Sequence, residues 1–247
     1  TTFSPDLDVQ FGSTVPPNAQ HIVPRNNRTS YTMQWNFHVQ RQLADELMVE
    51  VGYVGTRGLK LSTFSNVNTA LPGPGEVQPR RPYPQYGPLS EMGNQASSAY
   101  HGLQFKIDKR FSNGLSFRAN YTWGKTIDIL GAGFSKSMTA QNPHDINGDR
   151  SLSALHRKNL FTFDYIWQLP FGRGKAYGSG LSKAADAILG GWQLTGIVTS
   201  SSGPPFNTSI PRDIANIGAR VGAERPNQIG DPFAGVSGGP EQYINLA

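Results

Sequence analysis

The sequence lacks cysteine and long apolar runs, and both absences exclude classes of protein. Without a thiol, its 247 residues form no disulfide framework, thiolate metal site or cysteine nucleophile. No stretch approaches the ~18 consecutive apolar residues of a membrane-spanning helix, so a helical span is excluded. A β-barrel span is compatible with the sequence, because barrel strands alternate apolar and polar residues and barely raise the mean hydropathy.

Concentrated positive charge is also missing. The formal net charge is +5, but the lysines and arginines are scattered and form no run of five or more. A nucleic-acid-binding surface normally needs a concentrated basic stripe, so we expect no nucleic-acid partner. Glycine and proline, by contrast, are abundant at 28 and 18 residues. Both are poor helix residues, which argues against an all-helical protein and favours strands joined by turns.

The strongest positive signal is alternation of period two. Residues 31–40, 115–124 and 161–169 alternate between apolar and polar side chains, with Ile166 as the single exception. Such segments are typical of strands with one apolar face. Weaker copies lie at 47–54, 100–110 and 192–199. We therefore predict six strands at about 30–42, 47–62, 99–111, 115–126, 157–169 and 191–201.

The connections between these strands alternate between short and long. Leu43–Glu46 and Ser112–Gly114 are short, and Asn-Gly in the second supplies the positive φ angles of a tight hairpin. Residues 170–191 are intermediate and include a predicted short helix at 181–189. The long loops are predicted at 1–29, 63–98, 127–156 and 202–247. This layout, with strands of about nine to fourteen residues, predicts an all-β, antiparallel up-and-down transmembrane β-barrel segment, one partial barrel domain over residues 1–247.

The two strand faces predict two environments. Aromatic residues on the apolar faces are expected to meet lipid or its interface with water, where Tyr and Trp are favoured. The lipid-facing or girdle candidates are Tyr31, Trp35, Phe37, Tyr53, Phe117, Tyr121, Trp123, Phe163, Trp167 and Trp192. Charged residues on the opposite faces are expected in the lumen, where they line a solute path, contact a plug or simply form a wetted wall. These candidates are Glu50, Lys106, Asp108, Arg110, Arg118 and Asp164.

Three arginines are predicted at or beyond the rim that carries the long loops. Arg57, Arg80 and Arg81 could there meet the phosphates of lipopolysaccharide. Outer-membrane lipid and lipopolysaccharide are therefore the expected surroundings of the barrel wall. The interpretation rests on the predicted topology alone.

Four segments together resemble a known family. They are 49–58 (VEVGYVGTRG), 120–128 (NYTWGKTID), 168–172 (QLPFG) and 191–197 (GWQLTGI). In this order they resemble the barrel of TonB-dependent receptors of the Oar-like type, over roughly residues 30–206. The resemblance implies an outer-membrane barrel of ~22 strands, plugged by a separate N-terminal domain and energised through TonB.

Several parts expected of that family are not found in this sequence. No plug, TonB box or terminal strand ending in an aromatic residue is found in it. Six strands are also fewer than the ~8 of the smallest single-chain barrels. We therefore expect a segment of a larger barrel that reaches the plug and TonB through other parts of the chain and does not insert stably alone.

No grouping of residues predicts catalysis or a cofactor. Asp145–Asp149 has the alternating oxygen ligands of a calcium loop, but its glycine is at position four rather than six and no Glu follows at position twelve. A chance resemblance is the better interpretation, and the spacing of His144 and His156 does not suit zinc. The usual hydrolase and phosphate-loop motifs are missing, so we predict neither an enzyme nor a metal site.

The sequence thus predicts energised uptake of an unidentified solute through a plugged barrel. A passive structural or adhesive outer-membrane barrel is one alternative. A secreted β-sandwich that binds carbohydrate through exposed aromatic residues is another, because apolar strand faces also occur in soluble sandwiches. The presence of a plug domain would distinguish energised uptake from a passive barrel. A requirement for detergent would distinguish both barrels from the soluble sandwich.

Overall fold

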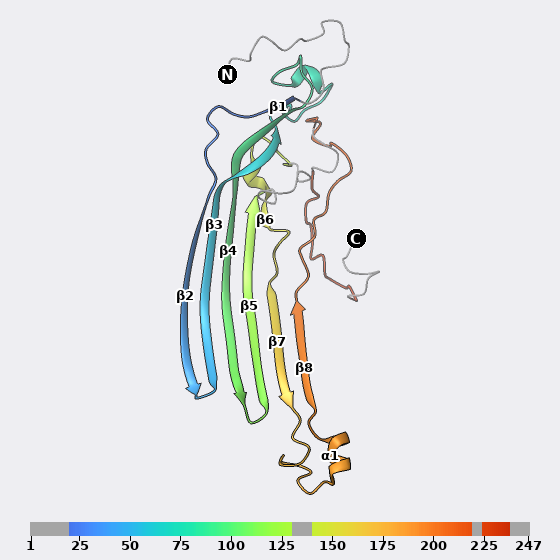
Figure 1. The fold of residues 1–247 in the computed structure, drawn as a ribbon. Helices are drawn as coiled ribbons and strands as arrows, with labels where there is room; N and C mark the ends of the chain where they lie inside the picture. Colours follow the sequence, from blue (N-terminus) through green and yellow to red (C-terminus); the bar gives the residue numbers. More distant parts are fainter. Residues whose placement is uncertain (1–19, 130–139, 219–223, 238–247) are drawn as a thin grey trace.

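One large sheet dominates the computed structural model, which describes residues 20–129, 140–218 and 224–237. Six strands lie side by side in the order β2-β3-β4-β5-β7-β8 (Figure 1). Their bounds are β2 Tyr31–Ala44, β3 Leu47–Asn66, β4 Leu89–Ser112, β5 Leu115–Ile129, β7 Asn159–Gln168 and β8 Gln193–Ser201. Each pairs antiparallel with its neighbour. The predicted all-β, up-and-down fold class is confirmed.

Short elements complete the fold. β1 (Gln20–Ile22) pairs parallel with β4, and β6 (Arg150–Leu152) pairs antiparallel with β5. Two 3₁₀ turns, η1 and η2, lie in the long connections, at Gln78–Arg80 and Ile146–Asp149. One short helix, α1, spans Lys183–Leu189 between β7 and β8, and Ser182 caps its N-terminus.

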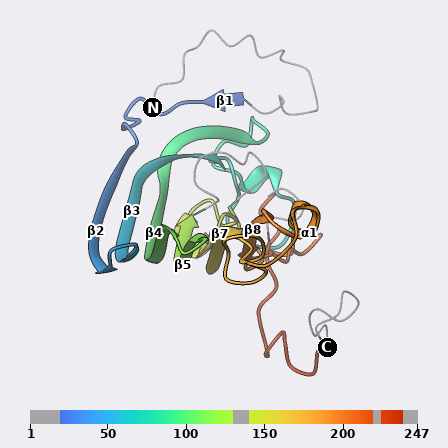
Figure 2. The ribbon, with the colours of Figure 1, turned by 60° about the horizontal axis from the view of Figure 1, so that its bottom comes forward.

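The two tight turns lie at the same end of the sheet. These turns, β2–β3 and β4–β5, share that end with the longer β7–β8 connection that carries α1, and the β3–β4 and β5–β7 connections lie at the other end (Figure 1). Asn113 and Gly114 have φ angles of 49° and 79°, as a tight hairpin between β4 and β5 requires. We call the two ends the turn end and the loop end. Viewed with the turn end forward, the strands form a curved wall (Figure 2).

Two strands extend further than their sequence pattern indicated. β3 continues to Asn66 and β4 begins at Leu89, so the connection expected at 63–98 shortens to residues 67–88. The pairing of β3 with β4 shifts register between Gly58 and Leu61 and again before Thr63. Each irregularity changes which face a residue occupies, so the simple alternation disappears although the pairing continues. β6 and η2 likewise lie within the loop expected at 127–156.

The burial of apolar residues is opposite to that of a soluble protein. A small buried cluster lies outside the middle of the sheet and consists of Ala96, Ile129, Ala140 and Ile146, with Leu61 against it. The aromatic residues of the strands range from half-buried to exposed; Phe37 is 68% exposed and Trp123 is 53% exposed. The accessible surface is 17209 Å², against about 10,800 Å² for a compact monomer of this mass.

That exposure decides against the secreted sandwich. A sandwich buries its apolar strand faces against a second sheet, whereas the described residues form a single sheet. No helix in the described part of the chain is both long and apolar enough to cross a membrane.

Candidate functional site

The strand register separates two faces. Phe37, Tyr53, Leu103 and Trp123 are successive partners across β2, β3, β4 and β5, so they share one face. The same pairing and alternation place nine of the ten lipid-facing candidates on this apolar face: Tyr31, Trp35, Phe37, Tyr53, Phe117, Tyr121, Trp123, Phe163 and Trp167. The tenth, Trp192, precedes β8 and donates its indole N–H to the carbonyl of Ile188 at 2.8 Å.

The apolar face carries an uncharged band with cations at both ends. On β4 and β5, no Asp, Glu, Lys or Arg lies on this face between Lys109 and Lys125. Lys125 is paired with His101, eight residues along β4 from Lys109. At ~3.4 Å per residue, the band is about 27 Å long, close to the ~25 Å apolar band of outer-membrane barrels.

The opposite face carries the charged lumen candidates in register. Across β3, β4 and β5, Glu50 is opposite Lys106, which is opposite Asn120. In the adjacent row, Asp108 of β4 is opposite Arg118 of β5, which is opposite Asp164 of β7. We call Glu50, Lys106, Asp108, Arg118 and Asp164 the charged ladder.

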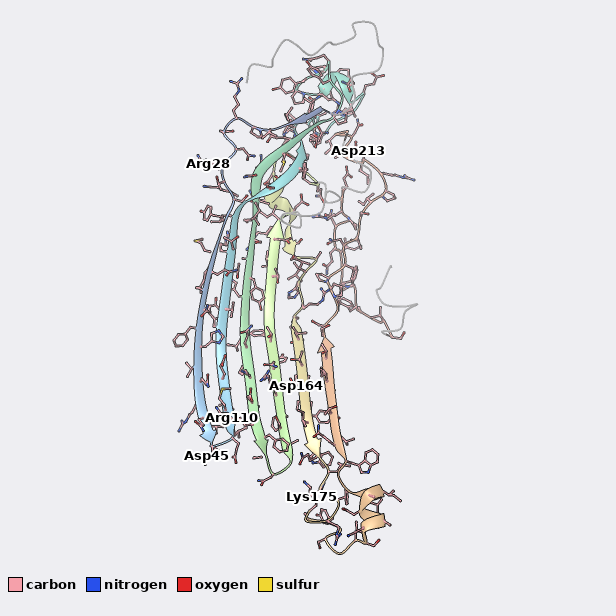
Figure 3. The ribbon with its side chains drawn as sticks, viewed as in Figure 1. Arg28, Asp45, Arg110, Asp164, Lys175 and Asp213 are labelled. Carbon is pink, nitrogen blue, oxygen red and sulfur yellow. The ribbon has the colours of Figure 1, made fainter. Side chains whose placement is uncertain are left out.

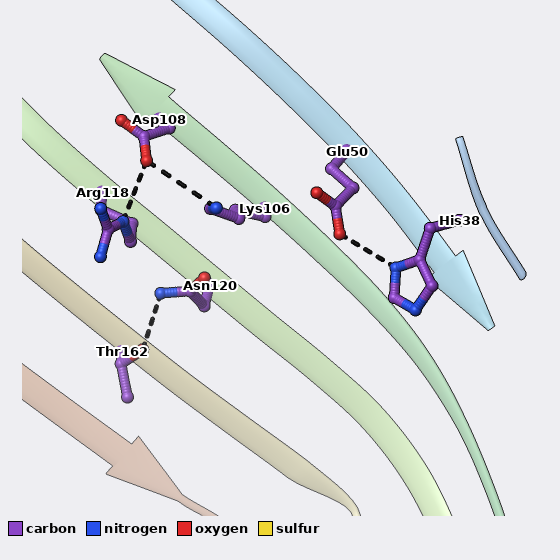
Figure 4. Close-up of polar contacts among 7 residues, drawn as sticks. All are labelled: His38, Glu50, Lys106, Asp108, Arg118, Asn120 and Thr162. Atoms are coloured by element: carbon purple, nitrogen blue, oxygen red, sulfur yellow. Dashed lines mark hydrogen bonds and ion pairs between the residues drawn. The ribbon is translucent and has the colours of Figure 1, made fainter. Parts of the chain in front are cut away.

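Ion pairs and hydrogen bonds connect the charged ladder across strands (Figure 4). Asp108 Oδ2 lies 3.0 Å from Arg118 Nε and 3.8 Å from Lys106 Nζ. Glu50 Oε1 lies 2.9 Å from Nδ1 of His38 on β2. One carboxylate therefore serves two cations. The contacts join β4 to β5 through Asp108 and, separately, β2 to β3 through Glu50.

Two of the lumen candidates, Asp164 and Arg110, take part in no ion pair among the described residues. Asp164, midway along β7, faces Arg118 in register but forms no ion pair among the described residues (Figure 3). Arg110 lies near the turn end of β4, beyond the last regular pair with β5, and its backbone N–H donates to the carbonyl of Glu46 at 2.8 Å. Arg110 is thus on the rim rather than within the rows.

The charged ladder lines a wall and does not enclose a ligand. The hollow beside Glu50, Lys106 and Asn120 has a volume of about 150 Å³. A pocket for a small molecule usually has ~300–1,000 Å³. The described residues contain no group of three or more His, Cys, Asp and Glu placed to hold a metal ion. The chemistry available here is hydrogen bonding and charge pairing along a wetted surface.

The connections at the loop end are tied to each other by hydrogen bonds. Arg80, in the β3–β4 connection, donates through Nη2 to the carbonyl of Asn216 at 2.5 Å. Asn216 in return donates through Nδ2 to the carbonyls of Gly73 and Gly75, at 2.9 and 2.7 Å. Segments 136 residues apart in sequence are thereby held together.

The β5–β7 connection joins the same assembly. His144 Nε2 lies 3.1 Å from the carbonyl oxygen of Thr69, and the carboxylate of Asp149 lies 2.5 Å from Nη1 of Arg225. Asp149 is 2% exposed, and its Oδ2 also accepts from the backbone N–H of Gln141 at 3.0 Å. This residue of the calcium-like segment is thus engaged in a buried ion pair. We call the connected segments 67–88, 140–149, 210–218 and 224–225 the loop cap.

Comparison with protein families agrees with this geometry. The model of the outer membrane beta barrel domain matches residues 2–247. The chain belongs to this family. Comparisons with curated proteins and with solved structures give no match. The barrel domain is therefore located in the bacterial outer membrane, as the sequence predicted.

Family membership gives the two ends of the barrel domain their orientation. In outer-membrane barrels the turns at the periplasmic end are short and the extracellular loops are long. By this rule the two tight turns make the end with α1 correspond to the periplasmic end, and the loop cap corresponds to the extracellular end.

The three arginines expected at the long-loop rim lie at the loop end, and two of them already have acceptors within the protein. Arg80 and Arg81 donate to carbonyls inside the loop cap, the latter to that of Asn68. Burial lowers the pKa of Arg81, and nearby Asp213 partly offsets this. Since both guanidinium groups already have protein acceptors, they are poorly placed for lipid phosphates. Arg57 is paired with Met33 on the apolar face, close to the loop end.

Proposed function

We propose that the barrel domain is part of the wall of a TonB-dependent receptor, which takes up a solute through a plugged pore. The observation that carries the proposal is the charged ladder, on the face opposite the uncharged band. A lumen that holds a plug needs donors and acceptors of both signs along its wall. Half-exposed Arg118 and the carboxylate of Asp164 supply such groups.

The family-like segments also support the proposal. Residues 49–58 lie in β3 and 120–128 in β5. Residues 168–172 follow β7 into the periplasmic connection, and 191–197 enter β8. The four segments that resemble TonB-dependent receptors are thus neighbouring parts of one wall.

The sheet needs further strands to serve as a pore. β2 and β8 each have a single neighbour among the described strands. Each unpaired N–H or C=O in lipid costs several kcal/mol, so both edges must pair with other strands to close the barrel. In the proposed receptor, other parts of the same polypeptide supply these strands.

A depletion experiment tests energised uptake of a solute whose identity is unknown at the outset. Four strains are grown in one complex medium: with and without the full-length protein, each with and without TonB. The proposal predicts solutes whose depletion, measured by mass spectrometry, requires both proteins. Depletion that requires the barrel protein but not TonB would identify a passive pore and contradict the proposal. Identical media from all four strains would favour the structural or adhesive barrel.

A further inference from the structure

A cavity opens on the apolar face where that face meets the extracellular rim. Its volume is about 770 Å³. The apolar part of its lining is formed by Tyr53, Leu103, Trp123, Ile127 and Leu152. The cationic part is formed by Lys125, Arg150 and Lys158, and the rings of His101 and His156 also line the cavity. The lining includes no Asp or Glu.

A local gap in strand pairing creates this cavity. β5 pairs with β7 as far as Trp123 and with β6 from Ile127, so the segment between them has no strand partner on that side. Residues 153–158 cover it instead. The N–H of Gly124 donates to the carbonyl of Lys158 at 2.9 Å, and that of Thr126 donates to Nδ1 of His156 at 3.2 Å. Both N–H groups are thus hydrogen-bonded although no strand pairs with residues 124–126 on this side.

The positive charge around the cavity has no counter-charge in an ion pair among the described residues. Lys125, Arg150 and Lys158 take part in none of the ion pairs formed by the described residues. Burial lowers the pKa of His156, and the nearby charges of Lys125, Arg157 and Lys158 lower it further. Lys125 and Lys158 of the cavity lining are thus close enough to His156 to act on it.

The geometry points to a site for one phosphate-bearing, acylated glycolipid of the outer leaflet, with its phosphate between Lys125 and Lys158 and an acyl chain against Leu103 and Trp123. The position of Lys125 at the extracellular end of the uncharged band supports this occupant, because lipid phosphates lie at that boundary. The apolar lining continues into the band, where the acyl chain meets the bilayer. A free phosphate would use only the cationic part and leave the apolar part exposed.

Native mass spectrometry of the full-length protein, purified from outer membranes, tests the site. Wild-type protein is compared with Lys125→Gln/Lys158→Gln and with a matched control, Lys175→Gln/Lys183→Gln, at the periplasmic end. We expect glycolipid binding to be about a hundredfold weaker in the first variant, because two charge-assisted contacts are lost and each is worth about tenfold in affinity. No change is expected in the control. Equal retention by both variants would overturn the proposal.

Two further measurements keep the test decisive. Heat-dependent gel mobility shows whether each variant is folded. If the double variant does not fold, Lys158→Gln alone replaces it, because Lys158 lies outside the strands. Delipidated wild-type protein is then offered phosphatidylcholine vesicles with or without the phosphorylated glycolipid, or inorganic phosphate. Capture that needs the glycolipid and persists in excess phosphate supports the proposal. Displacement by phosphate, or equal capture of phosphatidylcholine, contradicts it.

Discussion

Asp108 on β4 accepts from Arg118 on β5 across 3.0 Å, and the same oxygen lies 3.8 Å from Lys106. One carboxylate therefore separates two cations that would otherwise repel each other across adjacent strands. The side chain of Arg118 is 52% exposed and that of Asp108 is 21% exposed. Solvent screening makes such a contact modest in energy, so its main effect is to fix side-chain positions on the polar face.

The first prediction concerns this contact. Asp108→Asn should lower the free energy of unfolding by about 0.5–1 kcal/mol, because Lys106 and Arg118 lose their shared counter-charge. A double-mutant cycle with Arg118→Gln, followed by urea unfolding in detergent micelles, measures the coupling. Asp45→Asn in the exposed β2–β3 turn is the control. An equal loss in the control would show that the pair contributes nothing.

The second prediction concerns the apolar face, where the indole of Trp35 covers Gly55. A Cβ at Gly55 would lie 2.2 Å from Cε2 of Trp35. Gly55→Ala should therefore displace the ring and cost about 1–3 kcal/mol. Gly203→Ala, where a Cβ meets nothing within 4 Å, is the matched control. Unfolding of both variants in the same micelles tests the difference, and equal stabilities would contradict the contact.

The third prediction concerns the loop cap. Arg225→Ala leaves the buried carboxylate of Asp149 without its cation, which should cost about 2–4 kcal/mol locally. The cap should then be cleaved faster by an external protease on intact cells. Arg212→Ala, which removes an exposed arginine of the same connection, should leave cleavage unchanged. Wild-type cleavage rates in Arg225→Ala would show that the ion pair does not hold the cap.

The fourth prediction concerns pH. Because burial and the charges of Lys125, Arg157 and Lys158 lower the pKa of His156, the folded state binds fewer protons than the unfolded state below about pH 6.5. The contribution to stability is full above that pH and is lost as pH falls toward the lower, folded pKa. Protonation also removes the lone pair that accepts from the Thr126 N–H.

Hydrogen exchange of the Thr126 amide measures this effect. After correction for intrinsic rates, its protection should fall between about pH 7.5 and pH 5.5. In His156→Gln, an amide oxygen can accept without titrating, so protection should not depend on pH in this range. A pH-dependent loss in that variant would assign the effect to another group.

The strands that could be predicted from the sequence are those with one face toward lipid and the other toward water. β2, β5 and β7 alternate over most of their length, with Ile166 of β7 as the exception, because one face of each strand is apolar. The extended ends of β3 and β4 were missed, since the irregular pairing near Gly58 and Leu61 interrupts that alternation. β6 has three residues, too few for any period to be visible.

The contacts of the charged ladder, the loop cap and the rim cavity could be predicted only in part, because they depend on strand register and on packing between distant segments. Alternation put Asp108 and Arg118 on polar faces, but their contact depends on the register of the β4–β5 hairpin. The link between Arg80 and Asn216 depends on long-range packing of two loops. The rim cavity depends on His156 accepting from Thr126, and a histidine among basic residues was the only hint in the sequence.

The central claim is that the apolar face meets lipid and the charged ladder faces a watery lumen. Because these residues contain no native cysteine, single cysteines at positions 103 to 107 of β4 can be labelled in intact outer membranes with a water-soluble maleimide. This orientation predicts labelling at Gln104 and Lys106 and protection at Leu103, Phe105 and Ile107 until detergent is added. Labelling of all five positions, or the opposite alternation, would contradict it.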